Sequence, residues 1–202
     1  MLARAAVYFF IKIKLFILKV MNKNTDFGKS FSFDVSTKIR AGNNKLSIGE
    51  NVYLRSNPRG YHAGMPFPTT ILLDKEGAEC FIGDNCRING AYLHCQKKLV
   101  IGKNSVIASG VHIIDSNGHI LNSNNRTKGR DIPADIIIGE NVWIGLNSVI
   151  LKATIIGNNS VVAAGSIVKG EYPANSLIQG NPAKLVKILE IEDENCNSPQ
   201  GR

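Results

Sequence analysis

An aliphatic side chain returns at every sixth position through the second half of the sequence. From residue 138 onward these positions are Ile138, Ile144, Ile150, Ile156, Val162 and Val168. Four residues after each of the first five comes a small or β-branched residue, namely Val142, Ser148, Thr154, Ser160 and Ser166. The period matches neither an α-helix, which repeats about every 3.6 residues, nor a plain strand, which repeats every second residue. It therefore indicates a short strand followed by a sharp corner.

The same hexad begins earlier at Ile48, Ile82 and Ile101, each followed by glycine and then, two residues further on, by asparagine. Both residue types allow the positive-φ backbone of a tight corner. Three hexads make one triangular coil of about 18 residues, and successive coils pair as parallel strands about 4.8 Å apart. The sequence predicts a β-solenoid with these aliphatic side chains inside. Cys86 takes a small-residue position of its hexad and is predicted to pack in the core.

The amino-acid composition limits the kinds of molecule that this protein can be expected to bind. The chain has 202 residues, enough for one domain with small appendages, and its 44% hydrophobic residues exclude a wholly disordered protein. The four cysteines form no C-x-x-C pair, and no signal-peptide pattern precedes them, so we expect neither disulfides nor a metal site. The net charge of +8 suits an anionic cofactor, glycan or membrane surface. We expect no nucleic-acid partner, because no aromatic-rich basic stretch or nucleic-acid motif is present.

The N-terminal segment is apolar over residues 5–20 but is interrupted by Lys12, Lys14 and Lys19. The uninterrupted apolar stretches are therefore shorter than the roughly 20 residues of a membrane-spanning helix. One interpretation is a helix or strand that caps the exposed edge of the solenoid. The other is a basic amphipathic segment on an anionic membrane. We expect a cytoplasmic protein, with peripheral contact to the inner face of the cell membrane under the second interpretation.

At the other end, Asn181 and Pro182 suit the N-cap and first position of a short C-terminal helix through residues 183–187, followed by a disordered tail. The expected organisation is a cap segment over 1–40, the solenoid over 41–180, and the C-terminal helix and tail over 181–202.

Three segments carry a family resemblance. They are residues 138–145 (IGENVWIG), 163–169 (AAGSIVK) and 180–184 (GNPAK). Together with the hexads they resemble the hexapeptide-repeat acyltransferases, especially the branch that O-acetylates sugars and bacterial surface polysaccharides. The resemblance implies an all-β fold, the left-handed parallel β-helix. It also implies a homotrimer with active sites between subunits, acetyl-CoA as acyl donor, no metal, and a sugar or polysaccharide acceptor.

Acetyl transfer to a hydroxyl needs a general base and a donor to the developing oxyanion. Histidine is the best base near neutral pH, and we predict His119. It closes a D-x-x-x-H element that begins at Asp115, where the hexads stop and a non-periodic stretch over 115–135 begins. The catalytic histidine of the resembling family has a similar place. Asp115 either orients this imidazole or forms a turn. If His119 is only a solvated loop residue, the base is next sought at His94 and then at His112.

Trp143 is the second predicted catalytic residue. It takes the sixth position of the hexad that begins at Ile138, a position that faces outward. In the resembling sugar acetyltransferases this tryptophan lies at the active site between subunits, and its indole N–H can serve the reacting carbonyl. The alternative is that Trp143 only packs at the trimer interface.

The resemblance also implies a cofactor groove near the A-A-G-S segment. Backbone amides at Ala164 and Gly165 are predicted to bind the pantetheine of acetyl-CoA, because small side chains let a ligand approach the backbone. Lys169, Lys184 and Lys187 are candidates for the phosphates, with a solvated surface charge as the alternative for each.

Arg126 and Arg130 lie in the stretch 115–135 and are predicted to contact the sugar acceptor. Asn89 matches the family's acceptor-contacting residue only loosely, and residues 55–68 have no assigned role. The expected function is acetyl-CoA-dependent O-acetylation of a sugar in capsule, O-antigen or exopolysaccharide biosynthesis. The alternatives are N-acetylation of an amino sugar or nucleotide-sugar, and a non-catalytic β-solenoid subunit.

Overall fold

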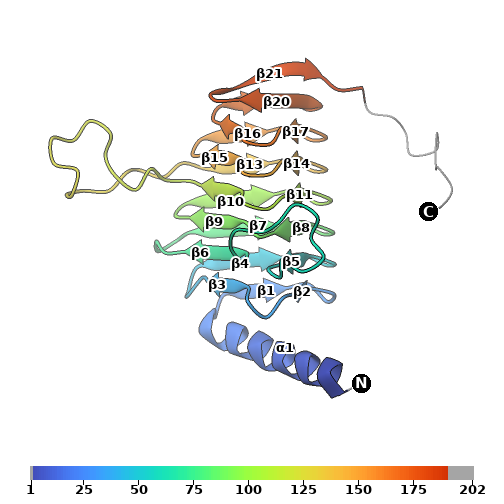
Figure 1. Cartoon of the computed structure of the whole chain (residues 1–202). Helices are drawn as coiled ribbons and strands as arrows, with labels where there is room; N and C mark the ends of the chain where they lie inside the picture. The colour runs from blue at the N-terminus through green and yellow to red at the C-terminus, as the bar shows by residue number, and fades with distance from the viewer. Residues whose placement is uncertain (1, 191–202) are drawn as a thin grey trace.

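The computed structural model describes residues 2–190, with side chains from residue 10 onward. Helix α1 (Leu2–Met21) precedes a left-handed parallel β-helix, in which three flat faces wind around one core (Figure 1). Face A contains β1 (Thr25–Phe27), β4 (Lys45–Ile48), β7 (Glu79–Ile82), β10 (Lys98–Ile101), β13 (Ile136–Ile138), β16 (Thr154–Ile156) and β19 (Glu171–Tyr172).

Face B contains β2 (Ser32–Phe33), β5 (Tyr53–Arg55), β8 (Arg87–Asn89), β11 (Val106–Ile107), β14 (Trp143–Ile144), β17 (Val161–Val162), β20 (Ser176–Gly180) and β21 (Ala183–Ile188). Face C contains β3 (Lys38–Arg40), β6 (Thr70–Leu73), β9 (Tyr92–Cys95), β12 (His112–Ile114), β15 (Val149–Leu151) and β18 (Ile167–Val168). Each coil passes through faces A, B and C in turn, and every neighbouring pair is parallel except β20 with β21.

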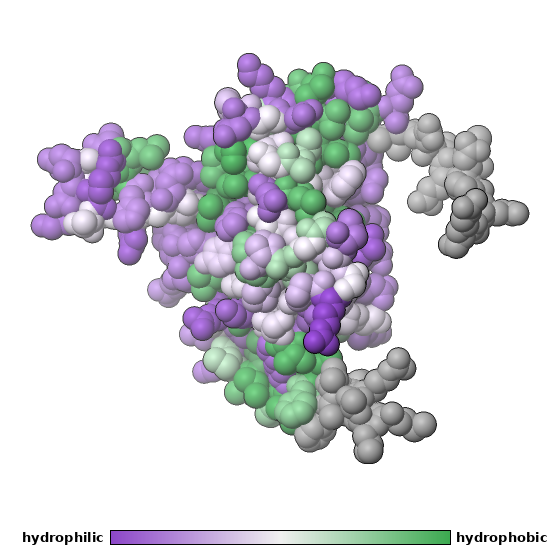
Figure 2. All heavy atoms as spheres, viewed as in Figure 1, coloured by the Kyte–Doolittle hydropathy of each residue, from purple (hydrophilic) through white to green (hydrophobic). Residues whose placement is uncertain are grey.

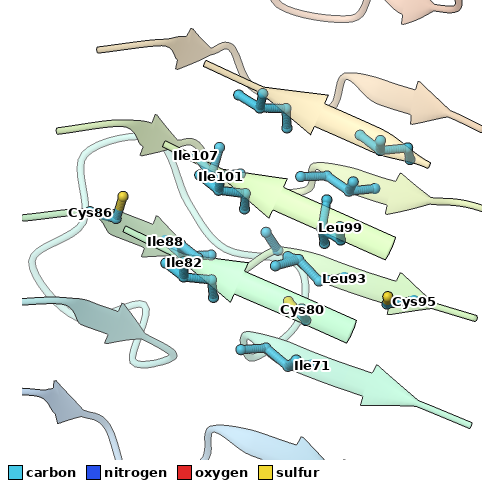
Figure 3. Close-up of a cluster of buried hydrophobic side chains, with 14 of the residues drawn as sticks. Ile71, Cys80, Ile82, Cys86, Ile88, Leu93, Cys95, Leu99, Ile101 and Ile107 are labelled. Carbon is cyan, nitrogen blue, oxygen red and sulfur yellow. The ribbon is translucent and has the colours of Figure 1, made fainter. Parts of the chain in front are cut away.

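The predicted inward positions are confirmed. The isoleucines on which the hexads were counted are at most 3% exposed: Ile48, Ile82, Ile101, Ile138 and Ile156. Cys86 is fully buried, and Figure 3 shows it in the same cluster of core side chains as Ile88 and Ile107. The core is one continuous column along the coils, because each strand adds its inward side chains directly above those of the coil before.

Asparagine and glycine form the corners between faces A and B. Asn51, Asn85, Asn104, Asn141 and Asn159 all have φ between 53° and 62°, the left-handed conformation that asparagine tolerates. Their side-chain amides also bond from coil to coil, as in the 3.1 Å bond from Asn141 to Asn159. The glycine before each corner is required for packing: a Cβ added at Gly102 would lie 2.5 Å from the backbone of Gly139 on the next coil.

The predicted start of the solenoid at residue 41 is wrong, because the solenoid begins earlier in the chain. The first coil is β1–β2–β3, and it starts at Thr25, since these strands pair with β4, β5 and β6. Phe27, Phe33 and Ile39 are spaced six apart and fill the inward positions of this coil. Aromatic residues at two of these positions hid the period, which had been counted on aliphatic residues.

The predicted C-terminal helix is wrong. Residues 183–188 form strand β21, which runs antiparallel to β20. Asn181 and Pro182 are the turn of this hairpin and do not cap a helix. The unpaired edge of β20 satisfies its backbone groups by pairing with β21, whereas a helix would leave that edge open. The predicted disordered tail lies outside the described residues.

Helix α1 covers the other end of the solenoid. Leu18 is buried against the core, with Ile11 and Leu15 packed beside it, so the capping interpretation is confirmed. Lys14 reinforces the contact: its Nζ donates to the carbonyls of Val35 and Thr37. Over the described part of the chain, no helix is both long and apolar enough to cross a membrane.

Candidate active site

Two non-periodic segments interrupt the coils, and they leave from different corners. Residues 56–69 connect β5 on face B to β6 on face C, and residues 115–135 connect β12 on face C to β13 on face A. We call them the inner loop and the projecting loop. Figure 1 shows the inner loop lying against the coils and the projecting loop standing away from them.

A groove of about 400 Å³ runs across face B below the inner loop. Its floor is a row of outward side chains that pair from strand to strand across β5, β8, β11 and β14: Tyr53, Arg87, Val106 and Trp143. Tyr61 and His62 of the inner loop form one side, and their rings lie 5.1 Å apart. Asn89 lies deeper, with its amide Nδ2 bonded to the carbonyl of Ile107 at 2.9 Å.

The inner loop is fixed to the coils by polar and steric contacts. Ser109 Oγ donates to the carbonyl of Gly64 at 2.7 Å. Gly90 leaves room for the loop, since a Cβ there would lie 2.3 Å from Met65 Cγ and 2.8 Å from the carbonyl of Phe67. The groove therefore has a preformed wall made by this chain alone.

Trp143 stands at one end of the groove with 56% of its surface exposed. The prediction that it faces outward is confirmed. Beyond it, the next coil turns from face B to face C at Ala164 and Gly165, the predicted cofactor contacts. The N–H of Gly165 donates to the carbonyl of Leu146 at 2.8 Å, whereas Ala164 is an exposed residue whose N–H has no hydrogen-bond partner among the described residues. Gly165 has φ +72° and open space where a Cβ would point, so a ligand can approach this backbone closely.

The three lysines predicted to bind the phosphates of acetyl-CoA lie near the last coil. Lys184 and Lys187 lie on β21, and Lys169 follows β18. The hydroxyl of Tyr172 connects these segments by donating to the carbonyl of Ala183 at 3.0 Å or of Lys169 at 3.4 Å. All three lysines are exposed, and none forms an ion pair within residues 2–190.

His119 is exposed on the projecting loop, and the base of that loop is clamped. Asp131 accepts the backbone N–H of Asn117 and binds Lys152 Nζ, both at 2.7 Å. The hydrogen bond from Lys152 is the main reason that the pKa of Asp131 lies below its usual range. The apolar side chains Leu121 and Ile132 of this loop are 70% and 81% exposed. In Figure 2 the projecting loop is mainly hydrophilic with one hydrophobic patch.

Asp115 takes neither of its predicted roles: its carboxylate neither orients His119 nor forms the expected turn into Asn117 and Gly118, and it instead holds the turn between β9 and β10. It is fully buried, its carboxylate accepts the backbone N–H groups of Gln96 and Lys97 at 2.7–2.9 Å, and it has no bond to His119. Burial raises its pKa, while these bonds act in the opposite direction. Arg126 is likewise used within the loop, where its guanidinium donates to the carbonyls of Ile120 and Leu121.

His119 and Trp143 do not meet within one chain. Trp143 lies on face B, whereas the projecting loop leaves the corner between faces C and A (Figure 1). Arg130 is exposed on the same loop and is equally remote from the groove. A site that uses both predicted catalytic residues must therefore combine the groove of one copy with the loop of another.

The other histidines occupy separate positions. His94 on face C binds Asp74 at 2.8 Å, and His112 packs between Phe67 and Tyr92 on the same face. Within residues 2–190 no group of three metal-ligating side chains is present. The groove residues Arg55, Tyr61 and Arg87 escaped the sequence prediction, because outward positions carry no periodic signal. Aligning the hexads would have placed Arg87 and Trp143 in one outward row.

Comparison with protein families gives a match between residues 135–169 and the hexapeptide repeat of succinyl-transferase. The chain is 38% identical over 122 residues to WbbJ of Escherichia coli K12, a putative lipopolysaccharide biosynthesis O-acetyl transferase; the match covers 55% of this chain and 62% of that relative. It is 36% identical over 96 residues to the galactoside O-acetyltransferase of the same organism, covering 48% of this chain and 47% of the relative. The chain thus spans less than two thirds of the length of either relative.

Solved structures share the fold. A galactoside acetyltransferase in complex with coenzyme A has a TM-score of 0.55 and 22% identity, covering 93% of this chain and 78% of the other. AntD, an N-acyltransferase from Bacillus cereus in complex with dTDP and 3-hydroxybutyryl-CoA, has a TM-score of 0.63 and 18% identity, covering 88% of each chain.

Proposed function

We propose that the chain is a hexapeptide-repeat acyltransferase and that it transfers an acetyl group from acetyl-CoA to a sugar hydroxyl. The acceptor is a precursor or chain of a bacterial surface polysaccharide: capsule, O-antigen or exopolysaccharide. The observation that carries this proposal is the groove of face B, where exposed Trp143 lies one strand from the bare backbone of Ala164. The relatives named as a putative lipopolysaccharide biosynthesis O-acetyl transferase and a galactoside O-acetyltransferase support the choice of a sugar.

Acetyl-CoA supplies an activated acetyl thioester as the second substrate, and the residues present suit it. The free N–H of Ala164 and the open space at Gly165 accept a narrow polar chain such as pantetheine. Lys169, Lys184 and Lys187 offer positive charge for the phosphates at the end of the solenoid.

The catalytic roles follow from the chemistry of the side chains. His119 accepts the proton of the acceptor hydroxyl as its oxygen attacks the acetyl carbon. The indole N–H of Trp143 donates to the acetyl oxygen as negative charge develops there. The proton held on His119 then passes to the departing thiolate, which leaves a free thiol and a neutral histidine. Asp115 holds the turn between β9 and β10 and takes no part in proton transfer.

We propose a homotrimer in which the projecting loop of each copy reaches the groove of its neighbour. Three copies related by a threefold axis present the C–A corner of one chain to face B of the next, which gives each site one His119 and one Trp143. The exposed apolar side chains of Leu121 and Ile132 are then buried against the neighbour.

We also propose that α1 contacts the cytoplasmic face of the membrane. The side of the helix that faces away from the core is apolar, with Phe10, Phe16 and Val20 between 58% and 69% exposed. Figure 2 shows the hydrophobic surface at this end of the molecule. Lys19 and Lys23 lie beside these residues and suit anionic headgroups. This position would hold the active sites close to lipid-linked glycan precursors.

The test of the function is release of free thiol from acetyl-CoA in the presence of neutral sugars, amino sugars, nucleotide-sugars and polysaccharides. We expect a sugar-dependent rate, with kcat lowered about 10²–10⁴-fold in His119→Ala. His94→Ala serves as the matched control, because this histidine lies on face C, and it should retain the rate. Full activity in His119→Ala would refute His119 as the base. Transfer to amino sugars alone would instead favour N-acetylation. Absence of both turnover and acetyl-CoA binding would leave a non-catalytic solenoid.

A further inference from the structure

The groove of face B contains two arginines whose charges are not neutralised within the described chain. We propose that Arg55 and Arg87 bind a negatively charged group of the acceptor, so that the substrate is an anionic saccharide bearing a carboxylate or a phosphate. This inference rests on the proposed function and adds the chemical class of the acceptor. It also gives a role to the inner loop.

Arg87 is the central charge of the groove. It is exposed on β8, between Tyr53 on β5 and Val106 on β11 in the same outward row. It forms no ion pair with any residue from 2 to 190. Trp143 lies two strands further along this row, which puts the two backbones roughly 10 Å apart at about 4.8 Å per strand. A sugar unit held at Trp143 therefore extends toward Arg87.

Arg55 is held in place by aromatic stacking. Its guanidinium lies 5.5 Å from the ring centroids of both Tyr53 and Tyr61, and it makes no side-chain hydrogen bond to the described residues. Stacking fixes the plane of the guanidinium and leaves the N–H donors at its edge for a ligand. Because Tyr61 belongs to the inner loop, the loop determines the position of this charge.

Among the described residues, no carboxylate lines the groove. Asp34, which lies at its outer end, is already used: it accepts the hydroxyl of Tyr53 at 3.0 Å and the backbone N–H groups of Ser56 and Asn57 at 2.7 and 2.8 Å. Because this carboxylate is already hydrogen-bonded and forms no ion pair with Arg55 or Arg87, the groove retains positive charge. Unpaired guanidinium groups beside flat aromatic surfaces are well suited to an anion on a sugar ring.

The remaining groove residues suit the neutral part of a saccharide. Trp143 and Tyr61 provide ring surfaces for the apolar face of a sugar. Asn89 uses its amide Nδ2 within the coil, which leaves its side-chain oxygen as an acceptor for a sugar hydroxyl. The groove thus combines aromatic surfaces, one neutral acceptor and two cations, and this combination selects a charged sugar over a neutral one.

The test measures binding by isothermal titration calorimetry, with coenzyme A in excess so that no nucleotide binds in the cofactor groove. The probes are methyl β-D-glucuronide, which carries a carboxylate, UDP-glucose, which carries a diphosphate, and the neutral methyl β-D-glucoside. We expect at least one anionic probe to bind about tenfold or more tightly than the glucoside. The stronger of the two anionic probes identifies the source of the charge. Arg87→Gln and Arg55→Gln should each remove most of this preference, whereas Arg40→Gln, on face C, should leave it unchanged.

Equal binding of all three probes, binding of none, or a preference that survives both substitutions would overturn the inference. So would a change in oligomeric state in Arg87→Gln without a change in probe preference, since that would assign Arg87 to a subunit contact. The same experiments distinguish failure of the proposed function from failure of this inference. If no sugar is acetylated but glucuronide binding depends on Arg87, the anionic site stands and the catalytic proposal falls. If sugars are acetylated, and the anionic ones equally well by the wild type and by Arg87→Gln, the catalytic proposal stands and the anionic site falls.

Discussion

Two inactive variants should restore each other's activity if each active site combines two chains. His119→Ala removes the base from the projecting loop and leaves the groove intact. Trp143→Phe removes the indole donor, keeps the aromatic packing and leaves the loop intact. Loss of a general base lowers kcat by about 10²–10⁴-fold, and loss of one oxyanion donor costs roughly 2.7–4 kcal/mol, about 10²–10³-fold. A homotrimer of either variant alone should therefore have almost no activity.

The expected recovery follows from the positions of the two residues. In trimers assembled at random from equal amounts of both variants, a working site needs its loop from a Trp143→Phe chain and its groove from a His119→Ala chain. Each condition is met by half of the chains, so about one quarter of the sites are complete. A mixed preparation should show about a quarter of the wild-type rate. If both residues acted within one chain, no site would be complete.

The assay is thiol release after co-refolding of the two variants, using an acceptor that the sugar panel identifies. Burial raises the pKa of Cys80 to about 12 and of Cys86 to about 11, and Cys95 is also buried, so these thiols should not react with the reagent. Cys196 is changed to Ser in all variants. The control mixture of His119→Ala with the double variant should stay inactive, because neither chain carries His119. A mixed rate no higher than the mean of the two parents would refute the shared site.

Three further predictions concern stability, pH and membrane binding. Asp115→Ala should lower the free energy of unfolding by about 1–3 kcal/mol in chemical denaturation, since two partly buried N–H groups lose their acceptor. Asp115→Asn should cost less and retain kcat; a loss of kcat at unchanged stability would contradict the turn role. The folded pKa of Asp131 is lowered, so its clamp stabilises the loop above the unfolded value of about 3.9 and is lost as pH falls through the folded pKa. The Asn117 amide shift in NMR should follow that titration in the wild type and stay flat in Asp131→Asn. Phe16→Ser should reduce binding to phosphatidylglycerol vesicles in flotation, whereas Ile155→Ser, an exposed apolar change on face A, should not; equal binding would exclude α1 as the contact.

The coils could be predicted from the sequence because one side chain in every six must lie in the core. Ile138 and Ile156 had to be inside whatever the outer residues were, and Cys86 followed from its place in the hexad. The first coil was missed where Phe27 and Phe33 replaced aliphatic residues. The C-terminal hairpin was missed because Asn-Pro suits a tight turn as well as a helix start.

The candidate site was predictable only in part. Trp143 could be placed because its hexad position determines its direction, and it is exposed. The sequence could not decide between two roles for Asp115, because its burial and its hydrogen bonds depend on the tertiary structure. The pairing of His119 with a groove on another corner depends on assembly, which no local pattern encodes. Arg55 depends on Tyr61 of the inner loop for its position, and a non-periodic loop gives no rule for such a contact.

The bond between Gly64 and Ser109 has a consequence for how the solenoid opens. In a stack of coils each layer contacts only its neighbours, so unfolding can proceed from either end one layer at a time. This bond skips a layer: it joins the inner loop, which leaves the coil of β4–β6, to the coil of β10–β12. The three coils it spans should therefore open as one cooperative unit, and amide exchange should be slowest there. The inner loop and the groove residues Tyr53, Arg87 and Val106 belong to these coils, so fraying at the ends would leave this part of the groove intact.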